Sequence, residues 1–410
     1  MNTSINFARI KSVSLMKRFS WAFKLFVFIL AGSVLVFGGC SDRIIPPENQ
    51  ASARGAELGY FDANMLSSAI RWDGDFSASQ ATAGTLWPRS APVPAIYDMG
   101  IWIGGEVSGS VGVSAVMYGS EFTPGKIGTA GSAGVFKLIR GSASHADSAA
   151  WPIDLGAPHD SLGEPLIYGD ETLWTIYNDS VPTAHFRFQT APLYVEIQQT
   201  VFGYGAGDPW TNTMFIKFQI TNRGGLPIDQ MYIGFFADVD LGNASDDFAG
   251  WDAGRSCAYG YNSMTDSSWQ GAPPALGIYF LKTPVVQTME RGTTAFLSFV
   301  RTGDPQTAAE AYWMLRGRSP AGAPIIDPTT QRATTFMYAG DPVAHTGWID
   351  SVGGDKRLLL STGPITLLPD ETQTLLLGIT IAQGATALNS ISQLLHSVEI
   401  IRLSRTFWDF

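Results

Sequence analysis

The sequence has few of the residues on which catalytic and redox motifs depend. Of its 410 residues, only two are cysteine and five are histidine, and charged residues make up 15%, against roughly a quarter in an average soluble domain. The nucleophile-elbow, zincin, P-loop and CxxC patterns are absent from the sequence. These absences argue against the hydrolase, metallopeptidase, nucleotide-hydrolysing and redox classes that those motifs define.

Basic residues are also scarce. The sequence has 26 basic and 36 acidic residues, which gives a formal net charge of −10. A nucleic-acid-binding protein needs a basic face for the phosphate backbone. The charge balance therefore excludes nucleic acid as a partner and makes divalent cations more natural ligands.

Long apolar runs are limited to one, at residues 25–37, which is shorter than the roughly 20 residues of a membrane span. Basic residues and no acids precede it, as in an export signal. The run leads into Gly38-Gly39-Cys40, which resembles the lipobox of bacterial lipoproteins. The resemblance implies cleavage before Cys40, a lipid on its thiol and, because Ser41 follows, attachment to the membrane at the outer membrane or cell surface. The alternative is an ordinary signal peptide that stops at a cysteine.

The chain is accordingly divided into a signal peptide (residues 1–39), a lipidated Cys40 with a flexible tether (residues 40–55) and a single large domain (residues 56–410). If Cys40 carries a lipid, Cys257 has no partner for an intramolecular disulfide. Cys257 lies in an apolar stretch, so we expect it to be a small buried side chain.

Two segments near the middle of the chain alternate strictly between apolar and other residues, which predicts strands with one face in a core. In residues 214–221 one face carries Met214, Ile216, Phe218 and Ile220. In residues 231–239 one face carries Met231, Ile233, Phe235, Ala237 and Val239. About a dozen strand-like segments occur in all, without the alternation of strands and helices that parallel sheets require.

Helical periodicity occurs in two places. Asp304 and Pro305 have the pattern of a helix start, Gly317 closes that helix, and Tyr312 and Leu315 supply its inward face. Residues 389–404 repeat apolar side chains at helical spacing, at Ile391, Leu394, Leu395, Val398 and Ile401. The sequence therefore predicts a mainly β fold: a large antiparallel β-sandwich with a short inserted helix and a C-terminal helix.

An acidic loop follows the second strand and contains Asp238, Asp240, Asp246, Asp247 and Asp252. Ca²⁺ takes about six to eight oxygen ligands from flexible loops, and these five carboxylates with Asn243 could supply them. The spacing is not that of an EF-hand. The sequence predicts a structural Ca²⁺ site at the five aspartates, with one alternative: turn carboxylates that bind backbone groups, Arg223 or Arg255.

Several segments in order along the chain resemble an uncharacterised group of large secreted or surface proteins from Bacteroidetes-like bacteria, which often carry type IX secretion sorting modules. They include IWIGGEVSG near Trp102, GDETLW near Trp174, MFIKFQITNRG from Met214, and DVDLGNASDDFAGWD from Asp238. The resemblance covers most of the chain after residue 59. It implies no activity, because the group has none established.

Paired carboxylates beside tryptophan suggest a second class of function. Glycoside cleavage needs two carboxyl groups about 5–10 Å apart, and aromatic rings stack on sugars. Trp72 lies beside Asp73 and Asp75, and Trp174 lies beside Asp170 and Glu171. Packing in a β-sandwich core explains the same tryptophans equally simply.

The sequence thus predicts a cell-surface lipoprotein that acts as a structural or ligand-binding β module stabilised by calcium. The expected partners are glycans such as polysaccharides, and other surface proteins. The alternative is a carbohydrate-active enzyme, a glycoside hydrolase that uses paired carboxylates. A non-catalytic role is preferred, because no nucleophile or base can be placed from the sequence.

Overall fold

The computed structural model describes residues 56–77, 84–129, 133–142, 145–269 and 271–404. The expected signal peptide and the predicted lipidation site Cys40 with its tether lie outside the described residues. No helix in the described part of the chain combines the length and the apolar character needed to cross a membrane. The predicted fold class, mainly antiparallel β with few helices, is confirmed.

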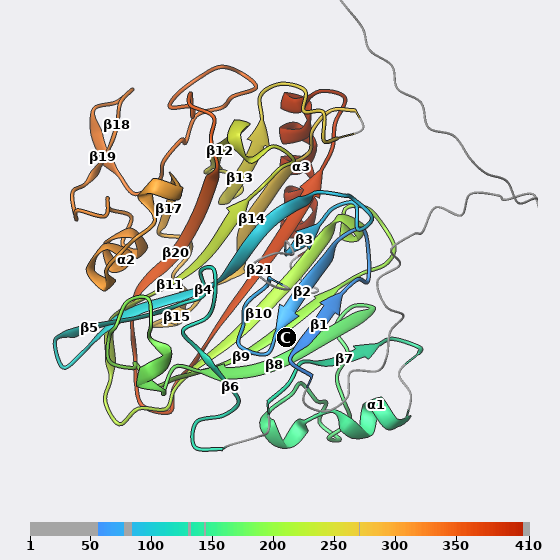
Figure 1. Ribbon diagram of the computed structural model, residues 1–410, viewed down its shortest axis with the longest axis vertical. Helices are drawn as coiled ribbons and strands as arrows, with labels where there is room; N and C mark the ends of the chain where they lie inside the picture. Colours follow the sequence, from blue (N-terminus) through green and yellow to red (C-terminus); the bar gives the residue numbers. More distant parts are fainter. Residues whose placement is uncertain (1–55, 78–83, 130–132, 143–144, 270, 405–410) are drawn as a thin grey trace, which may run out of the picture. The chain divides into compact units, whose positions relative to one another are not determined.

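Two large antiparallel sheets dominate the structure (Figure 1). The first sheet has the strand order β1 (Leu58–Phe61), β2 (Ser67–Arg71), β3 (Thr85–Leu86), β4 (Pro94–Val107), β11 (Ile228–Val239), β20 (Lys356–Leu367) and β17 (Ala295–Val300), with β5 (Ser110–Ala115) beside β4. The second has the order β12 (Asp247–Asp252), β13 (Cys257–Asn262), β14 (Ala275–Lys282), β21 (Thr372–Ala382), β10 (Thr213–Asn222), β9 (Val195–Gly203), β8 (Glu171–Asn178) and β6 (Thr123–Pro124), with β7 (Phe136–Ile139) beside β8.

Short elements connect these strands. Two small hairpins pair β15 (Val285–Val286) with β16 (Met289–Glu290) and β18 (Ile325–Asp327) with β19 (Arg332–Thr334). The α-helices are α1 (His145–Ala150), α2 (Ala308–Leu315) and α3 (Ala387–Leu403). Single 3₁₀ turns are η1 (Ile153–Leu155), η2 (Pro182–Ala184), η3 (Trp210–Asn212), η4 (Ala244–Asp246) and η5 (Arg301–Gly303).

The main core lies between the two sheets and contains every inward residue predicted for residues 214–221 and 231–239. Phe218 of β10 packs against Phe235 of β11, with ring centroids 6.3 Å apart. The two strands do not pair with each other, although they follow one another in sequence. β10 pairs with β9 and β21, whereas β11 pairs with β4 and β20. The two alternating faces therefore meet across the sandwich and not along one sheet.

Both sheets are also covered on their outer faces, each by one helix. Helix α2 buries Tyr312 and Leu315, the two residues predicted to face inward, in a cluster with Phe236 of β11. Helix α3 buries Leu394 and Val398 against the second sheet. The structure therefore has a helix on each side of the sandwich. Helix α2 covers the outer face of β11, whereas Phe215 on the outer face of β10 packs against Phe202, Tyr204 and Trp210.

The predicted start of the inserted helix is wrong by a few residues. Helix α2 begins after Thr307, whose side chain accepts the N–H of Glu310, and the Glu310 carboxylate accepts the N–H of Thr307. This reciprocal capping box satisfies two of the amides that a helix start leaves without partners. Asp304 instead lies near Arg357, with 3.5 Å between Oδ1 and Nε. In the C-terminal helix, Leu395 is only partly buried, unlike the other four predicted residues.

Candidate functional site

Three neighbouring strands of the first sheet place charged side chains in a row. The register aligns Asp238 of β11 with Asp98 of β4 on one side and with Arg357 of β20 on the other. Directly opposed residues in an antiparallel pair have side chains on the same face, about 5 Å apart at Cβ. Because Val239 faces the core, Asp238 and its two neighbours face outward, on the side of the sheet that α2 also covers.

Arg357 is the centre of a buried polar network in this row. Its Nε donates to the Tyr118 hydroxyl oxygen at 2.8 Å, and the Tyr118 hydroxyl donates to Asp238 Oδ2 at 2.8 Å. Arg357 also pairs with Asp238 Oδ2, at 3.3 Å from Nη2, and with Asp355. Burial raises the pKa of Asp238 to about 7, although Arg357 and Tyr118 oppose the shift. Asp238 is thus held in a place that disfavours its charged form.

A second carboxyl pair adjoins the row. Asp98 is only 1% exposed and accepts the backbone N–H of Tyr118. Burial, followed by the neighbouring Asp75, raises the pKa of Asp98 well above its ordinary value. Asp75 is itself buried and accepts the N–H of Ser77 at 2.7 Å. Asp98 is thus held where burial and the neighbouring carboxylate disfavour its charged form.

These groups line one pocket of about 840 Å³, which we call the aspartate pocket. Its charged and aromatic lining residues are Arg71, Asp73, Asp75, Tyr97, Asp98, Tyr118, Arg187, Asp238, Asp240, Arg301, Asp304, Asp355 and Arg357. Seven aspartates thus face four arginines. The pocket joins two regions that the sequence presents separately, the segment after Trp72 and the acidic loop.

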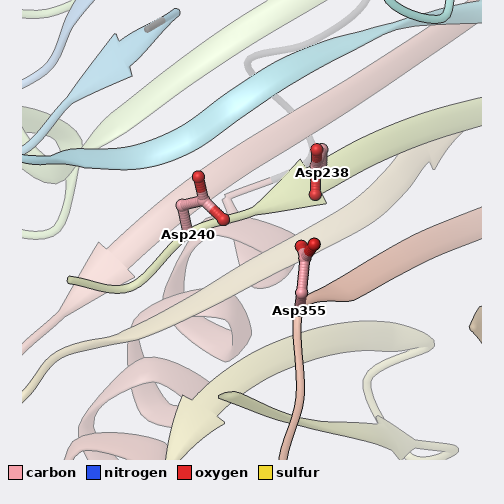
Figure 2. Close-up of side chains that lie close together, drawn as sticks. All are labelled: Asp238, Asp240 and Asp355. Carbon is pink, nitrogen blue, oxygen red and sulfur yellow. The ribbon is translucent and has the colours of Figure 1, made fainter. Parts of the chain in front are cut away.

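Three carboxylates of the pocket have the spacing of metal ligands. One oxygen each from Asp238, Asp240 and Asp355 lie within 4.8 Å of one another. Figure 2 shows Asp238 and Asp240 at the end of β11, with Asp355 approaching from the start of β20. Asp238 is 3% exposed, and its Oδ1 has no hydrogen-bond donor among the described residues. Burial and then Asp355 raise the pKa of Asp240 to about 6. Carboxylate oxygens are ligands for hard cations, so this group could hold a metal ion.

The other three aspartates of the predicted calcium set bind protein groups instead. Asp246 and Asp247 both accept from the Asn262 side-chain amide, at 2.9 and 3.1 Å. Asp247 also accepts the N–H of Leu241, and Asp252 accepts the N–H of Arg255 at 2.6 Å. The predicted set of five is therefore divided: Asp238 and Asp240 join Asp355, and the other three act as turn carboxylates.

The two carboxylate pairs predicted beside tryptophan lie in different places. Asp73 and Asp75 line the aspartate pocket, while Trp72 is partly buried against the main core. Trp174 is fully buried and packs against Phe136 and Trp151, which agrees with the core-packing interpretation.

The carboxylates beside Trp174 are bound by other groups. Glu171 is buried in an ion pair with Lys137, at 3.0 Å, and Asp170 accepts the N–H of Gly205 at 2.8 Å.

Cys257 is a free, buried thiol, as expected, and burial raises its pKa to about 12. Within the described ranges, no histidine belongs to a group of possible metal ligands.

Sequence reasoning missed several pocket residues, among them Asp98, Tyr118, Asp355 and Arg357. Two of them carried a usable signal. Asp98 and Arg357 are charged residues in otherwise apolar strands, and a charged residue is almost never fully buried without a partner. Their meeting depends on strand register, which a single sequence does not reveal.

Comparisons with known proteins do not assign the chain to a family. No family model matches the chain, and no curated protein matches it. Among solved structures, the chain is similar to the crystal structure of a putative aldose 1-epimerase from Escherichia coli K12, at 10% sequence identity and a TM-score of 0.29, with 80% of this chain and 99% of that chain covered. A likeness at this TM-score carries no argument about this protein.

Proposed function

We propose that this protein is an exported, lipid-anchored glycan-binding protein that takes a saccharide and Ca²⁺ in the aspartate pocket. One observation above all supports the proposal: three strands hold Asp98, Asp238 and Arg357 in a row that lines a pocket of about 840 Å³. Binding sites for small molecules have volumes of this order. Export and anchoring through Cys40 rest on the signal-like start of the sequence.

The lining chemistry suits a polyhydroxylated ligand. Carboxylates accept hydrogen bonds and guanidinium groups donate them, so adjacent hydroxyls of one sugar ring can bind both kinds of group at once. Arg71 pairs with Asp73 at 3.5 Å on one side of the pocket, and Arg357 fixes Asp238 on another. Tyr97 supplies a partly buried aromatic ring beside them. These groups are held in place before any ligand arrives, which lowers the entropic cost of binding.

Calcium fits the same pocket through Asp238, Asp240 and Asp355. Three carboxylates supply fewer oxygens than the about six to eight that Ca²⁺ takes. Water and sugar hydroxyls would complete the shell, so saccharide binding should depend on the ion. The two ligands are then coupled, and each should strengthen the binding of the other.

A glycan array tests the proposal. The mature chain from residue 40, made soluble by Cys40→Ser, is applied with excess CaCl₂ and with EGTA. We expect at least one saccharide ligand that binds with Ca²⁺, and we expect both EGTA and Asp355→Asn to abolish its binding. The matched control is Asp252→Asn, which removes a carboxylate outside the pocket. The proposal would be refuted if the protein bound no saccharide, or if Asp355→Asn bound the saccharide as tightly as the parent chain.

Glycoside hydrolysis is the second candidate, and the raised pKa of Asp238 favours it. A carboxyl with a pKa of about 7 is partly protonated at neutral pH, as the general acid of a glycosidase must be. Other carboxyls line the same pocket. Release of reducing ends from the bound saccharide, abolished by Asp238→Asn, would establish hydrolysis. A ligand that stays intact on prolonged incubation would rule it out.

A further inference from the structure

A second hollow, of about 560 Å³, lies beside the C-terminal end of helix α2. Its lining includes Tyr232 of β11, Arg316, Arg318 and residues 333–336, and we call it the arginine hollow. Tyr232 is six residues before Asp238 on the same strand, so the two sites face the same side of the sheet and lie roughly 20 Å apart. Among the described residues, none that lines this hollow is an aspartate or a glutamate. Its formal charge is therefore positive, in contrast to the aspartate pocket.

Neither arginine of the hollow has a carboxylate partner in the described part of the chain. The ion pairs within 4.0 Å there involve other arginines, such as Arg223 with Glu196 and Arg255 with Glu399. The two arginines therefore place positive charge in this hollow of a protein that has more acids than bases. Their N–H groups are the donors that a bound anion would use.

A tryptophan fixes the direction of both guanidinium groups. The Cζ atom of Arg316 lies 4.7 Å from the ring centroid of Trp313, and that of Arg318 lies 5.7 Å away. Arg318 Nη1 also donates to the carbonyl of Gly322 at 3.0 Å. The contacts with Trp313 hold both guanidinium groups at the hollow, where their other N–H groups can donate to a planar or tetrahedral anion.

Two glycines build this local arrangement. Gly317, between the two arginines, has φ +70°, and a Cβ there would lie 2.6 Å from Thr335 Cβ. A Cβ on Gly322 would lie 3.1 Å from the indole of Trp313. Both positions therefore specify a tight turn, packed against Trp313 and against Thr335, which follows β19. The arginines are held by the fold and do not extend freely into solvent.

We propose that the arginine hollow binds carboxylate or sulfate groups of an acidic polysaccharide. Arginine binds both groups through parallel, charge-assisted hydrogen bonds, and the local positive field draws anions to this site on an acidic protein. That the anion is carried by a saccharide rests on the proposed function, whereas the anion site itself does not. The hollow would select acidic glycans over neutral ones.

Isothermal titration tests the site with polygalacturonate, dextran sulfate and neutral dextran. The mature Cys40→Ser chain is used in EGTA, so that calcium in the aspartate pocket plays no part. We expect binding of one or both acidic polymers, no binding of dextran, and weaker binding as NaCl is added. The polymer that binds identifies carboxylate or sulfate as the anion.

Two double variants are compared: Arg316→Gln with Arg318→Gln, and Arg316→Lys with Arg318→Lys. The glutamine pair should lose at least about tenfold in affinity, because charge-assisted bonds are roughly twice as strong as neutral ones. The lysine pair should retain part of the binding, since charge remains while the paired geometry is lost. Unchanged melting temperatures show that each variant folds, and Arg318→Gln alone serves if the pair does not.

Three results would overturn the proposal: no acidic polymer binds, the glutamine pair binds as tightly as the parent chain, or polyglutamate binds as tightly as the acidic saccharides. Asp355→Asn separates the two sites. Loss of Ca²⁺-dependent glycan binding in Asp355→Asn, with acidic-polymer binding retained, assigns the two activities to different places. If the array finds no ligand but the acidic polymers bind, the function proposed for the aspartate pocket fails while the anion site stands.

Discussion

Calcium should stabilise this protein at pH 8 and not at pH 5. Burial raises the pKa of Asp238 to about 7 and that of Asp240 to about 6, whereas in the unfolded chain both titrate near 4. Between about pH 4 and pH 7 the folded, ion-free protein therefore binds more protons than the unfolded chain. Its free energy of unfolding falls as the pH rises through that range. Ca²⁺ binds the ionised carboxylates and should offset this loss above pH 7.

The size of the effect follows from the ligand set. With carboxylates from only Asp238, Asp240 and Asp355, a dissociation constant of about 10⁻⁴–10⁻³ M is expected, as in weak extracellular calcium sites. At about 10 mM Ca²⁺ the stabilisation is then about 1.4–2.7 kcal/mol. For a domain of roughly 350 residues, that raises the melting temperature by about 2–4 °C. At pH 5 the ion must displace protons from two carboxyls, which weakens binding by about a thousandfold and removes the shift.

The shift in melting temperature is measured by circular dichroism, with CaCl₂ or with EGTA, at pH 8 and at pH 5. Asp240→Asn should lose the shift at pH 8. Asp252→Asn should keep it, because the Asp252 carboxylate binds Arg255. A shift of equal size at both pH values, or one that persists in Asp240→Asn, would show that calcium binds elsewhere.

Two further substitutions test the buried ion pair at the pocket and the core between the sheets. Arg357→Gln should cost about 3–5 kcal/mol in urea unfolding, because it leaves the buried Asp238 carboxyl without its cation; a loss below about 1 kcal/mol would contradict the buried network. Phe218→Ala should cost about 3–5 kcal/mol, since the ring is fully buried against Phe235. Leu226→Ala is its control, as Leu226 is 52% exposed and should change stability by less than about 0.5 kcal/mol; equal losses in the two would refute the assignment of the core.

The sequence predicted burial better than it predicted neighbours. The alternation in β10 and β11 identified the core faces correctly, because period two is a property of one strand alone. That the two strands belong to different sheets follows from pairing with β20 and β21, more than a hundred residues later in the chain. Likewise the inserted helix was predicted from the start signal at Asp304 and Pro305 and the stop at Gly317, but its first residue is decided by the capping box of Thr307 and Glu310.

The same contrast holds for the aspartate pocket: local features were visible in the sequence, and neighbours on other strands were not. Asp238 and Asp240 are adjacent in sequence to the acidic loop and were found because of it. Asp98 and Arg357 reach Asp238 only through cross-strand register, and Asp355 reaches it through the loop before β20. Asp246 and Asp247 accept hydrogen bonds from Asn262, and Asp247 also accepts one from the Leu241 N–H, and the spacing of acids in the sequence does not reveal these partners.

The positions of β20 and β21 in the two sheets determine when the growing chain can complete its fold. β20 joins β17 to the rest of the first sheet, and β21 joins β14, β13 and β12 to the rest of the second. A growing chain that ends before residue 356 therefore has two half-built sheets with unpaired edges, which attract other strands. Pairing over such long sequence separations is slow. The nascent protein should remain unfolded until nearly all of it has been synthesised.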